Sequence, residues 1–202
     1  MRTTLFSIAI AVALLMAKVP AEGQTFGPYV TGGLNLTRDL GYHPTAVLGG
    51  GGLQMEANHF LATFESFVDD SHKLDSGTGL TARVQGVAFY RPTKNVFFGG
   101  GVGYSTLWTA PYNKNVWHPR AGAGYDRLSE SFSIRAQAEY VFAGTDHFNG
   151  LQGPEFNVYL PSPRSHAHWI YRETVGAYRF YPTPGSPSSF GTEARFTMMY
   201  RF

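Results

Sequence analysis

Hydrophobic and polar residues alternate with a period of two through much of the chain, and the pattern is clearest in its last seven residues. Large apolar side chains occupy every second position there, at Phe196, Met198, Tyr200 and Phe202. The positions between them, 197, 199 and 201, belong to the other face of an extended strand. Such a pattern is typical of a strand that separates an apolar from a polar environment.

The same alternation predicts a series of strands in the first 142 residues. They cover residues 26–37, 45–57, 60–68, 80–90, 96–108, 117–127 and 132–142. Short turns and longer loops, the latter over 38–44, 69–79 and 109–116, join them alternately. Because the strands are short and evenly spaced, a meander of antiparallel hairpins is the simplest topology.

The segment between residue 143 and the closing strand is harder to assign. Two further strands are predicted, over 154–160 and 168–181, and they bring the total to ten when 192–202 closes the sheet. In the second of them Arg172 and Glu173 are adjacent, and both cannot point inward without a bulge. If the pair instead forms a hairpin outside the sheet, the total is eight. We expect ten strands, with eight as the alternative.

The start of the chain has the layout of a secretory signal peptide. Arg2 precedes an apolar run over residues 5–16, which is too short to span a bilayer as a helix, and 19–21 offers a small-residue cleavage site. We therefore expect a signal peptide over 1–21 and one domain over 22–202. Because there is no cysteine, the sequence predicts neither a disulfide framework nor a lipid anchor.

Composition and charge fit an exported β-protein. The chain has 16 Lys+Arg and 14 Asp+Glu. Removal of Arg2 and Lys18 with the signal peptide takes two of the 16 and leaves 14 basic residues, equal to the number of acidic ones. This neutrality gives no indication of nucleic-acid binding. With 24 Gly, 16 Phe and 12 Tyr, the composition suits short strands bordered by aromatic residues, and many of these aromatics fall near predicted strand ends.

Isolated charges lie in the middle of the predicted strands, all on the polar face. Those expected to form a charge network are Glu56, Glu65, Arg83, Arg120, Arg135, Glu139 and Arg195. The interior of an eight- or ten-stranded barrel is barely wider than the side chains that fill it. Because unpaired charge would be costly there, we expect these groups to pair across a closed or narrowly conducting lumen.

The signal peptide and the C-terminal alternation that ends on Phe202 resemble those of small bacterial outer-membrane β-barrels of the OmpA/OmpX type. The resemblance implies an antiparallel up-and-down transmembrane β-barrel in the outer membrane, in contact with its lipid and lipopolysaccharide. It also implies that the barrel-assembly machinery reads the C-terminal apolar residues as an assembly signal. It does not imply one activity, because fold is not function.

The favoured function is a structural or surface-binding barrel that is not an enzyme. A small passive pore for ions or solutes is one alternative. A hydrolase at the barrel rim is another, because Asp69-Asp70 and Asp146-His147 fall at predicted strand ends where a protease could activate water. Ser66 and Ser105 are candidate nucleophiles for a lipid A hydrolase, but no spacing singles out a triad. The partner of the outer loops is not indicated.

Two other motifs are not expected to bind ligands. The glycines of 99–103 lack the Lys-Ser/Thr that follows in a phosphate-binding loop, and no helix comes after them. His166 and His168 share a strand face, but no carboxylate stands at a spacing that would complete a metal site. The sequence therefore predicts no cofactor and no metal.

Overall fold

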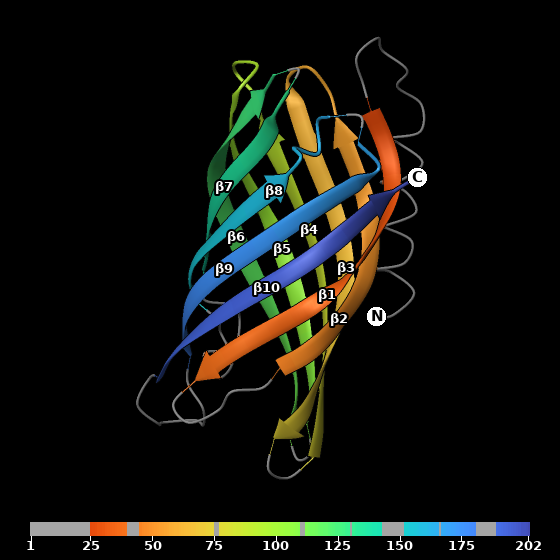
Figure 1. The fold of residues 1–202 in the computed structure, drawn as a ribbon. Coiled ribbons are helices and arrows are strands. Elements are labelled where there is room, and N and C mark those ends of the chain that lie inside the picture. Colours follow the sequence, from red (N-terminus) through yellow and green to blue (C-terminus); the bar gives the residue numbers. More distant parts are fainter. Residues whose placement is uncertain are drawn as a thin grey trace, which may run out of the picture.

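The computed structural model describes residues 25–39, 45–74, 77–109, 112–129, 131–142, 152–165, 167–180 and 189–202. They form one closed barrel of antiparallel strands, in which each strand pairs with its neighbours in sequence and β1 pairs with β10 (Figure 1). Ten strands make up this barrel, so the preferred prediction is confirmed. The predicted signal peptide over 1–21 lies outside the described residues. No helix in the described ranges is long and apolar enough to cross a membrane.

The strands differ in length. Their bounds are β1 Thr25–Asp39, β2 Thr45–Glu56, β3 Phe60–Leu74, β4 Gly77–Tyr90, β5 Val96–Thr109, β6 Tyr112–Leu128, β7 Ser133–Val141, β8 Gly153–Leu160, β9 Trp169–Phe180 and β10 Ser189–Arg201. Where each described strand is paired on both sides, closure leaves no exposed strand edge, so backbone groups that face lipid have partners within the sheet.

Several strands are longer than the alternation predicts. The segment 69–79, expected as a loop, is mostly strand, because β3 and β4 pair from Asp69 opposite Thr81 to Leu74 opposite Gly77. Most of the expected loop 109–116 likewise belongs to β6. Backbone hydrogen bonds hold these ladders together, and they form between polar residues as readily as between apolar ones. A prediction from the pattern of apolar side chains therefore underestimates the length of such strands.

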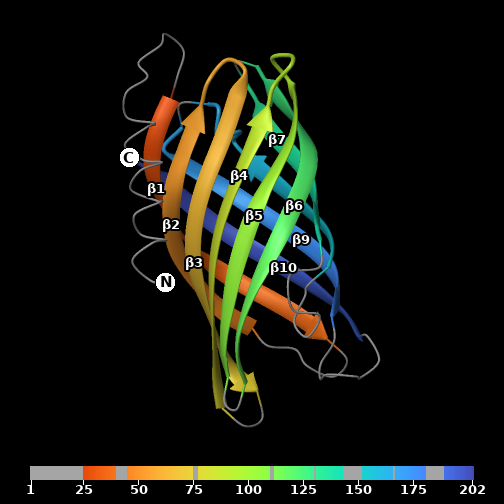
Figure 2. The same ribbon diagram turned by 180° about the vertical axis from the view of Figure 1, so that it is seen from behind.

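The two ends of the barrel differ. The start of β1, the C-terminus and the turns 57–59, 91–95, 129–132 and 161–168 share one end, here named the terminal end. At the opposite end, β3 and β4 extend beyond their neighbours (Figures 1 and 2). β9, β10 and β1 cross the barrel obliquely in Figures 1 and 2, a tilt that closure of a sheet requires.

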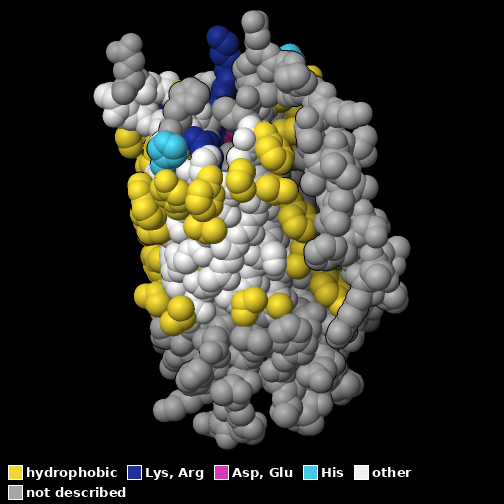
Figure 3. Space-filling view, turned by 90° about the vertical axis from the view of Figure 1, so that its right-hand side faces the viewer, with side chains coloured by type: hydrophobic (Ala, Val, Ile, Leu, Met, Phe, Trp, Pro, Cys, Tyr) yellow, Lys and Arg dark blue, Asp and Glu magenta, His cyan; other side chains and the backbone are white. Residues whose placement is uncertain are grey.

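The barrel carries apolar side chains outside and charged ones inside. In β7 and the residue before it, Phe132 is 50% exposed, whereas Arg135 is 2% and Glu139 6% exposed. On the wall formed by β1 to β3, hydrophobic side chains gather in two bands with a glycine-rich zone between them (Figure 3). This distribution is the reverse of that in a soluble sandwich and suits a wall surrounded by lipid.

The adjacent charges of β9 need no bulge. Arg172 is buried inside the barrel, whereas its neighbour Glu173 lies on the outer face. β9 pairs with β10 in continuous register from Phe180 opposite Ser189 to Trp169 opposite Tyr200. The bulge considered from the sequence is therefore absent from this pairing.

Candidate functional site

Charged side chains fill the described part of the lumen and form ion pairs. Among the described residues, six arginines pair with carboxylates there, namely Arg83, Arg91, Arg120, Arg135, Arg172 and Arg195. Six carboxylates accompany them, namely Glu56, Glu65, Asp126, Glu139, Glu155 and Glu193. All seven residues expected to form the network belong to these two groups.

At the terminal end, Glu56, Arg91, Asp126 and Arg135 form a compact set, here named the terminal cluster. Arg91 Nη2 lies 2.9 Å from Glu56 Oε2 and 2.8 Å from Asp126 Oδ2. Arg135 contacts the same two carboxylates, with Nη2 2.7 Å from Glu56 Oε1 and Nε 2.8 Å from Asp126 Oδ1. Because two cations share two anions, no charge in the cluster is left without a counter-ion.

The ring of Phe97 lies beside the terminal cluster. The guanidinium carbon of Arg135 lies 5.2 Å from the ring centroid, and Phe89 packs edge-on at 5.3 Å. Gly124 makes room for this ring, because a Cβ at that position would lie 2.1 Å from Phe97 Cζ. Because Gly124 of β6 has no side chain, the ring of Phe97 can extend from β5 into the lumen.

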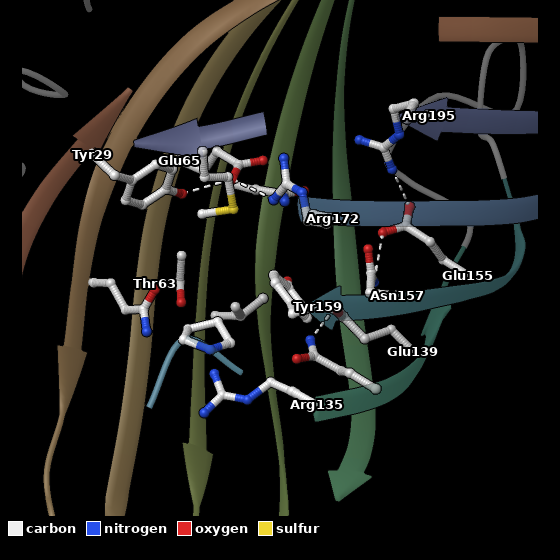
Figure 4. Close-up of a pocket in the computed structure, with 16 residues that line it drawn as sticks. Tyr29, Thr63, Glu65, Arg135, Glu139, Glu155, Asn157, Tyr159, Arg172 and Arg195 are labelled. Carbon is white, nitrogen blue, oxygen red and sulfur yellow. Dashed lines mark hydrogen bonds and ion pairs between the residues drawn. The ribbon is translucent and has the colours of Figure 1, made fainter. Parts of the chain in front are cut away.

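In the centre of the barrel, Glu65 accepts hydrogen bonds from two strands on either side of the barrel closure (Figure 4). The Tyr29 hydroxyl donates to Glu65 Oε2 at 2.6 Å, and Arg172 Nη1 donates to the same atom at 2.6 Å. Arg172 Nε also donates to the Thr197 hydroxyl at 3.2 Å. The carboxylate of Glu65 thus joins β1, β3 and β9, and Arg172 links them to Thr197 on β10.

A third set of charges extends toward the opposite end. Arg120 donates from Nε to Glu139 at 2.8 Å, from Nη2 to Glu155 at 2.7 Å and from Nη1 to Gln85 at 2.7 Å. Glu155 also accepts from Arg195 at 2.8 Å and from the Tyr178 hydroxyl at 2.7 Å. One glutamate on β8 therefore holds two arginines from different parts of the wall.

The set ends with Glu193, which lies near two arginines. Arg83 Nη2 is 3.2 Å from Glu193 Oε1, and Arg195 Nε is 3.6 Å from the same atom. The Asn35 amide donates to Glu193 at 2.7 Å. Arg83 is the most exposed of the six arginines, with 18% of its side chain accessible, because it lies nearest the opposite end.

Little space remains between these side chains. The central cavity, which Glu65, Arg135, Tyr159 and Arg195 help to line, has a volume of about 20 Å³. That is room for one or two water molecules. The described part of the lumen is therefore a packed polar core.

The turn 161–168 covers the terminal end. Its Ser162 is fully buried and donates to Asp126 Oδ1 at 2.8 Å. Arg201 holds the turn by donating to the carbonyl oxygens of Pro163 at 2.6 Å and Ala167 at 3.0 Å. Arg164 adds a hydrogen bond to the carbonyl of Lys94 in the β4–β5 turn. The mouth at this end is closed by backbone that side chains hold in place.

Five charged members of the lumen were absent from the expected network: Arg91, Asp126, Glu155, Arg172 and Glu193. Arg91 precedes a proline and was expected in a turn, although it continues the inward series of β4. Asp126 lies near the end of the predicted strand 117–127 and is not among the seven residues of the expected network. Glu155 and Arg172 lie in the segments whose strand assignment was uncertain, whereas Glu193 lies in the predicted closing strand 192–202, on the same face as Arg195. Strict alternation over β8, β9 and β10 is the signal that would have included them.

The other candidate residues occupy different places. Phe196, Met198, Tyr200 and Phe202 lie on the outer wall, with Tyr200 and Phe202 packed edge-on at 5.1 Å. Ser66 is exposed on the outer wall, whereas Ser105 lies opposite Arg83 on the adjoining strand. Asp146 and His147 lie outside the described residues, as do the side chains of Asp69 and Asp70. Among described residues, no three His, Asp or Glu side chains are grouped to hold a metal ion.

A closed barrel with an apolar wall, a charged and packed interior and ten tilted strands defines a small bacterial outer-membrane β-barrel protein. The outer membrane is the location that this distribution fits, because the paired charges of the lumen are turned away from lipid. The class leaves the particular role open.

No protein-family model matches the sequence, and no curated protein matches it. Among solved structures, the chain is similar to Neisserial surface protein A (NspA), with 7% identity over 90% of this chain and 100% of that one and a TM-score of 0.44. It is also similar to Ail, the attachment invasion locus protein of Yersinia pestis, with 13% identity, the same coverage and a TM-score of 0.40.

Proposed function

We propose that this protein is a non-conducting barrel whose lumen serves as a structural core and whose opposite end serves as a binding surface outside the cell. The observation that supports a closed lumen is the sharing of carboxylates between arginines from different strands. An ion could pass only by displacing groups such as Arg120 from Glu139 and Glu155. Removing one member of a buried pair costs about 3–5 kcal/mol, so such a path would open rarely.

Conductance in planar bilayers tests the closed lumen. The protein is refolded in detergent, and flotation with liposomes first establishes that it has inserted. The expected result is the absence of stable conductance steps from inserted protein. Large and stable steps would instead identify a small passive pore, and the structural role of the lumen would be wrong.

We further propose that the terminal end faces the periplasm. Short turns at one end and longer connections at the other are typical of outer-membrane barrels. An epitope inserted at 75–76, between β3 and β4, should be accessible to antibody on intact cells. The same epitope inserted between Asn58 and His59 should be accessible only after the outer membrane is permeabilised. The reverse result would invert the orientation.

The apolar residues at 196, 198, 200 and 202 are proposed to be the signal that the barrel-assembly machinery reads. Their position on the outer wall supports this role, since another protein can contact them while the sheet closes. Phe202→Ala should lower the amount of folded barrel in cells while leaving refolding in detergent unchanged. If folding in cells and refolding in detergent fall equally, Phe202 contributes to the stability of the barrel and is not an assembly signal. The two hydrophobic bands are proposed to meet lipid, with lipopolysaccharide at the opposite end.

A further inference from the structure

A second cavity lies inside the lumen toward the opposite end. Arg83, Gln85, Gly103, His118 and Arg120 help to line it, and its volume is about 20 Å³. It is separate from the central cavity beside Glu65 and Tyr159, although Gln85 and Glu155 line both. The space holds one or two water molecules or a group of similar size, so a sugar or a phosphate ester would not fit.

Gly103 creates this space. In the register of the sheet it lies between Gln85 on β4 and His118 on β6. A Cβ at Gly103 would meet its nearest atoms at 3.7–3.9 Å, which is ordinary contact. At Gly124, by contrast, the ring of Phe97 already occupies the position. The cavity at Gly103 is therefore open space that no described side chain fills.

His118 faces this space with an unused polar atom. The residue is 6% exposed, and its Nδ1 has no hydrogen-bond partner among the described residues. Leaving a buried polar atom without a partner is unfavourable. An imidazole can carry its proton on Nδ1, so this atom can donate to an acceptor placed in the cavity.

The lining of the cavity is positive. Arg83 and Arg120 both line it, and the carboxylate that lines it, Glu155, pairs with Arg120 and Arg195. Outside the lining, Arg120 also pairs with Glu139 and Arg83 with Glu193. The hydrogen bonds from Arg83 to Glu193 measure 3.2 and 3.3 Å, longer than the 2.7–2.8 Å of Arg120. A buried guanidinium can donate a charge-assisted hydrogen bond to an anionic acceptor placed beside it.

We propose that this cavity is a binding site for one small monovalent anion, a halide or a carboxylate group, held between His118, Arg83 and Arg120. The anion would accept hydrogen bonds from the imidazole and the guanidinium groups and balance the positive lining. This site is independent of the conductance of the barrel, because a closed lumen can still exchange an ion with solution at one end.

Chloride NMR on the full protein, folded in an uncharged detergent, tests the site. The unmodified barrel should broaden the chloride line saturably, and acetate should compete. Gly103→Leu fills the space without removing a charge, and His118→Phe removes the donor. His118→Phe should weaken binding about tenfold or more, as expected for loss of a charge-assisted hydrogen bond. Gly103→Leu should weaken it at least as much, because its side chain occupies the place of the ion. Heat-modifiable gel migration establishes that each variant is folded.

Gly49→Ala is the matched control, because a Cβ there meets nothing within 4 Å. It should broaden the line as the unmodified protein does. If Gly103→Leu and His118→Phe also broaden it equally, chloride binds elsewhere and the proposal is wrong.

Crystals of the unmodified protein grown with bromide give a second measurement that does not depend on the variants folding. An anomalous peak within hydrogen-bonding distance of His118 Nδ1 supports the site. The crystals should contain bromide at a concentration that displaces chloride in the NMR titration. An empty cavity under that condition overturns the proposal.

Discussion

Arg172 Nη1 and Glu65 Oε2 lie 2.6 Å apart in the middle of the barrel, and the two side chains are 6% and 1% exposed. They come from β9 and β3, which are 107 residues apart in sequence. This ion pair therefore connects the two halves of the chain across the lumen. Its energy depends on both partners being present, because either charge alone would be buried without a counter-ion.

We expect Arg172→Met to destabilise the refolded barrel by about 3–5 kcal/mol, because it leaves Glu65 charged and unpaired. The double variant Arg172→Met/Glu65→Leu should regain much of that loss, since replacing both partners of a buried pair is often nearly neutral. Equilibrium unfolding in urea measures both. If the double variant is as unstable as the sum of the single variants, the two residues are not coupled.

Gly124→Ala should cost about 1–3 kcal/mol, because its Cβ would overlap the Phe97 ring, which Phe89 and Arg135 hold in place. Adding Phe97→Leu to this variant should restore part of the stability. Gly49→Ala, on open outer wall, should change stability by less than about 0.5 kcal/mol. Similar effects at Gly124 and Gly49 would show that glycine is needed for the strand backbone and not for the ring.

Ala138→Arg should destabilise the membrane-inserted barrel by about 2–4 kcal/mol, because this side chain lies on the outer wall and would place a charge in lipid. Asn58→Arg, in an exposed turn, is the control and should be neutral. Unfolding from lipid vesicles is the appropriate measurement. If Ala138→Arg is also neutral there, residue 138 does not face lipid.

Arg201→Met should expose the turn 161–168 to protease while the barrel remains folded. The substitution removes the hydrogen bonds to the carbonyls of Pro163 and Ala167, and trypsin can then reach Arg164. Arg127→Met, which changes an exposed arginine, should leave the turn protected. Mass spectrometry of the digest locates the cut. Equal cleavage in both variants and in the unmodified protein would show that Arg201 does not hold the turn.

Most of the fold follows from residue alternation, but the pairing of charges does not. Period-two patterns place Arg135 and Glu139 on the face opposite Phe132 without coordinates. They do not show that Arg135 pairs with Glu56, 79 residues away, because that contact depends on barrel curvature and register. Polar strand ends such as the end of β3 were expected as loop because they lack an apolar face. The cavity beside Gly103 could not be foreseen, since glycines at 99 and 101 have the same sequence context but crowded surroundings.

The position of Arg201 near the end of the chain has a consequence for the order of assembly. The turn 161–168 lies between β8 and β9, so it exists before the final strand arrives. The guanidinium that holds its carbonyls is carried by β10, the strand that closes the sheet against β1. The mouth at that end can therefore be sealed only once β10 has paired with β9, and until then water retains access to the arginines and carboxylates within.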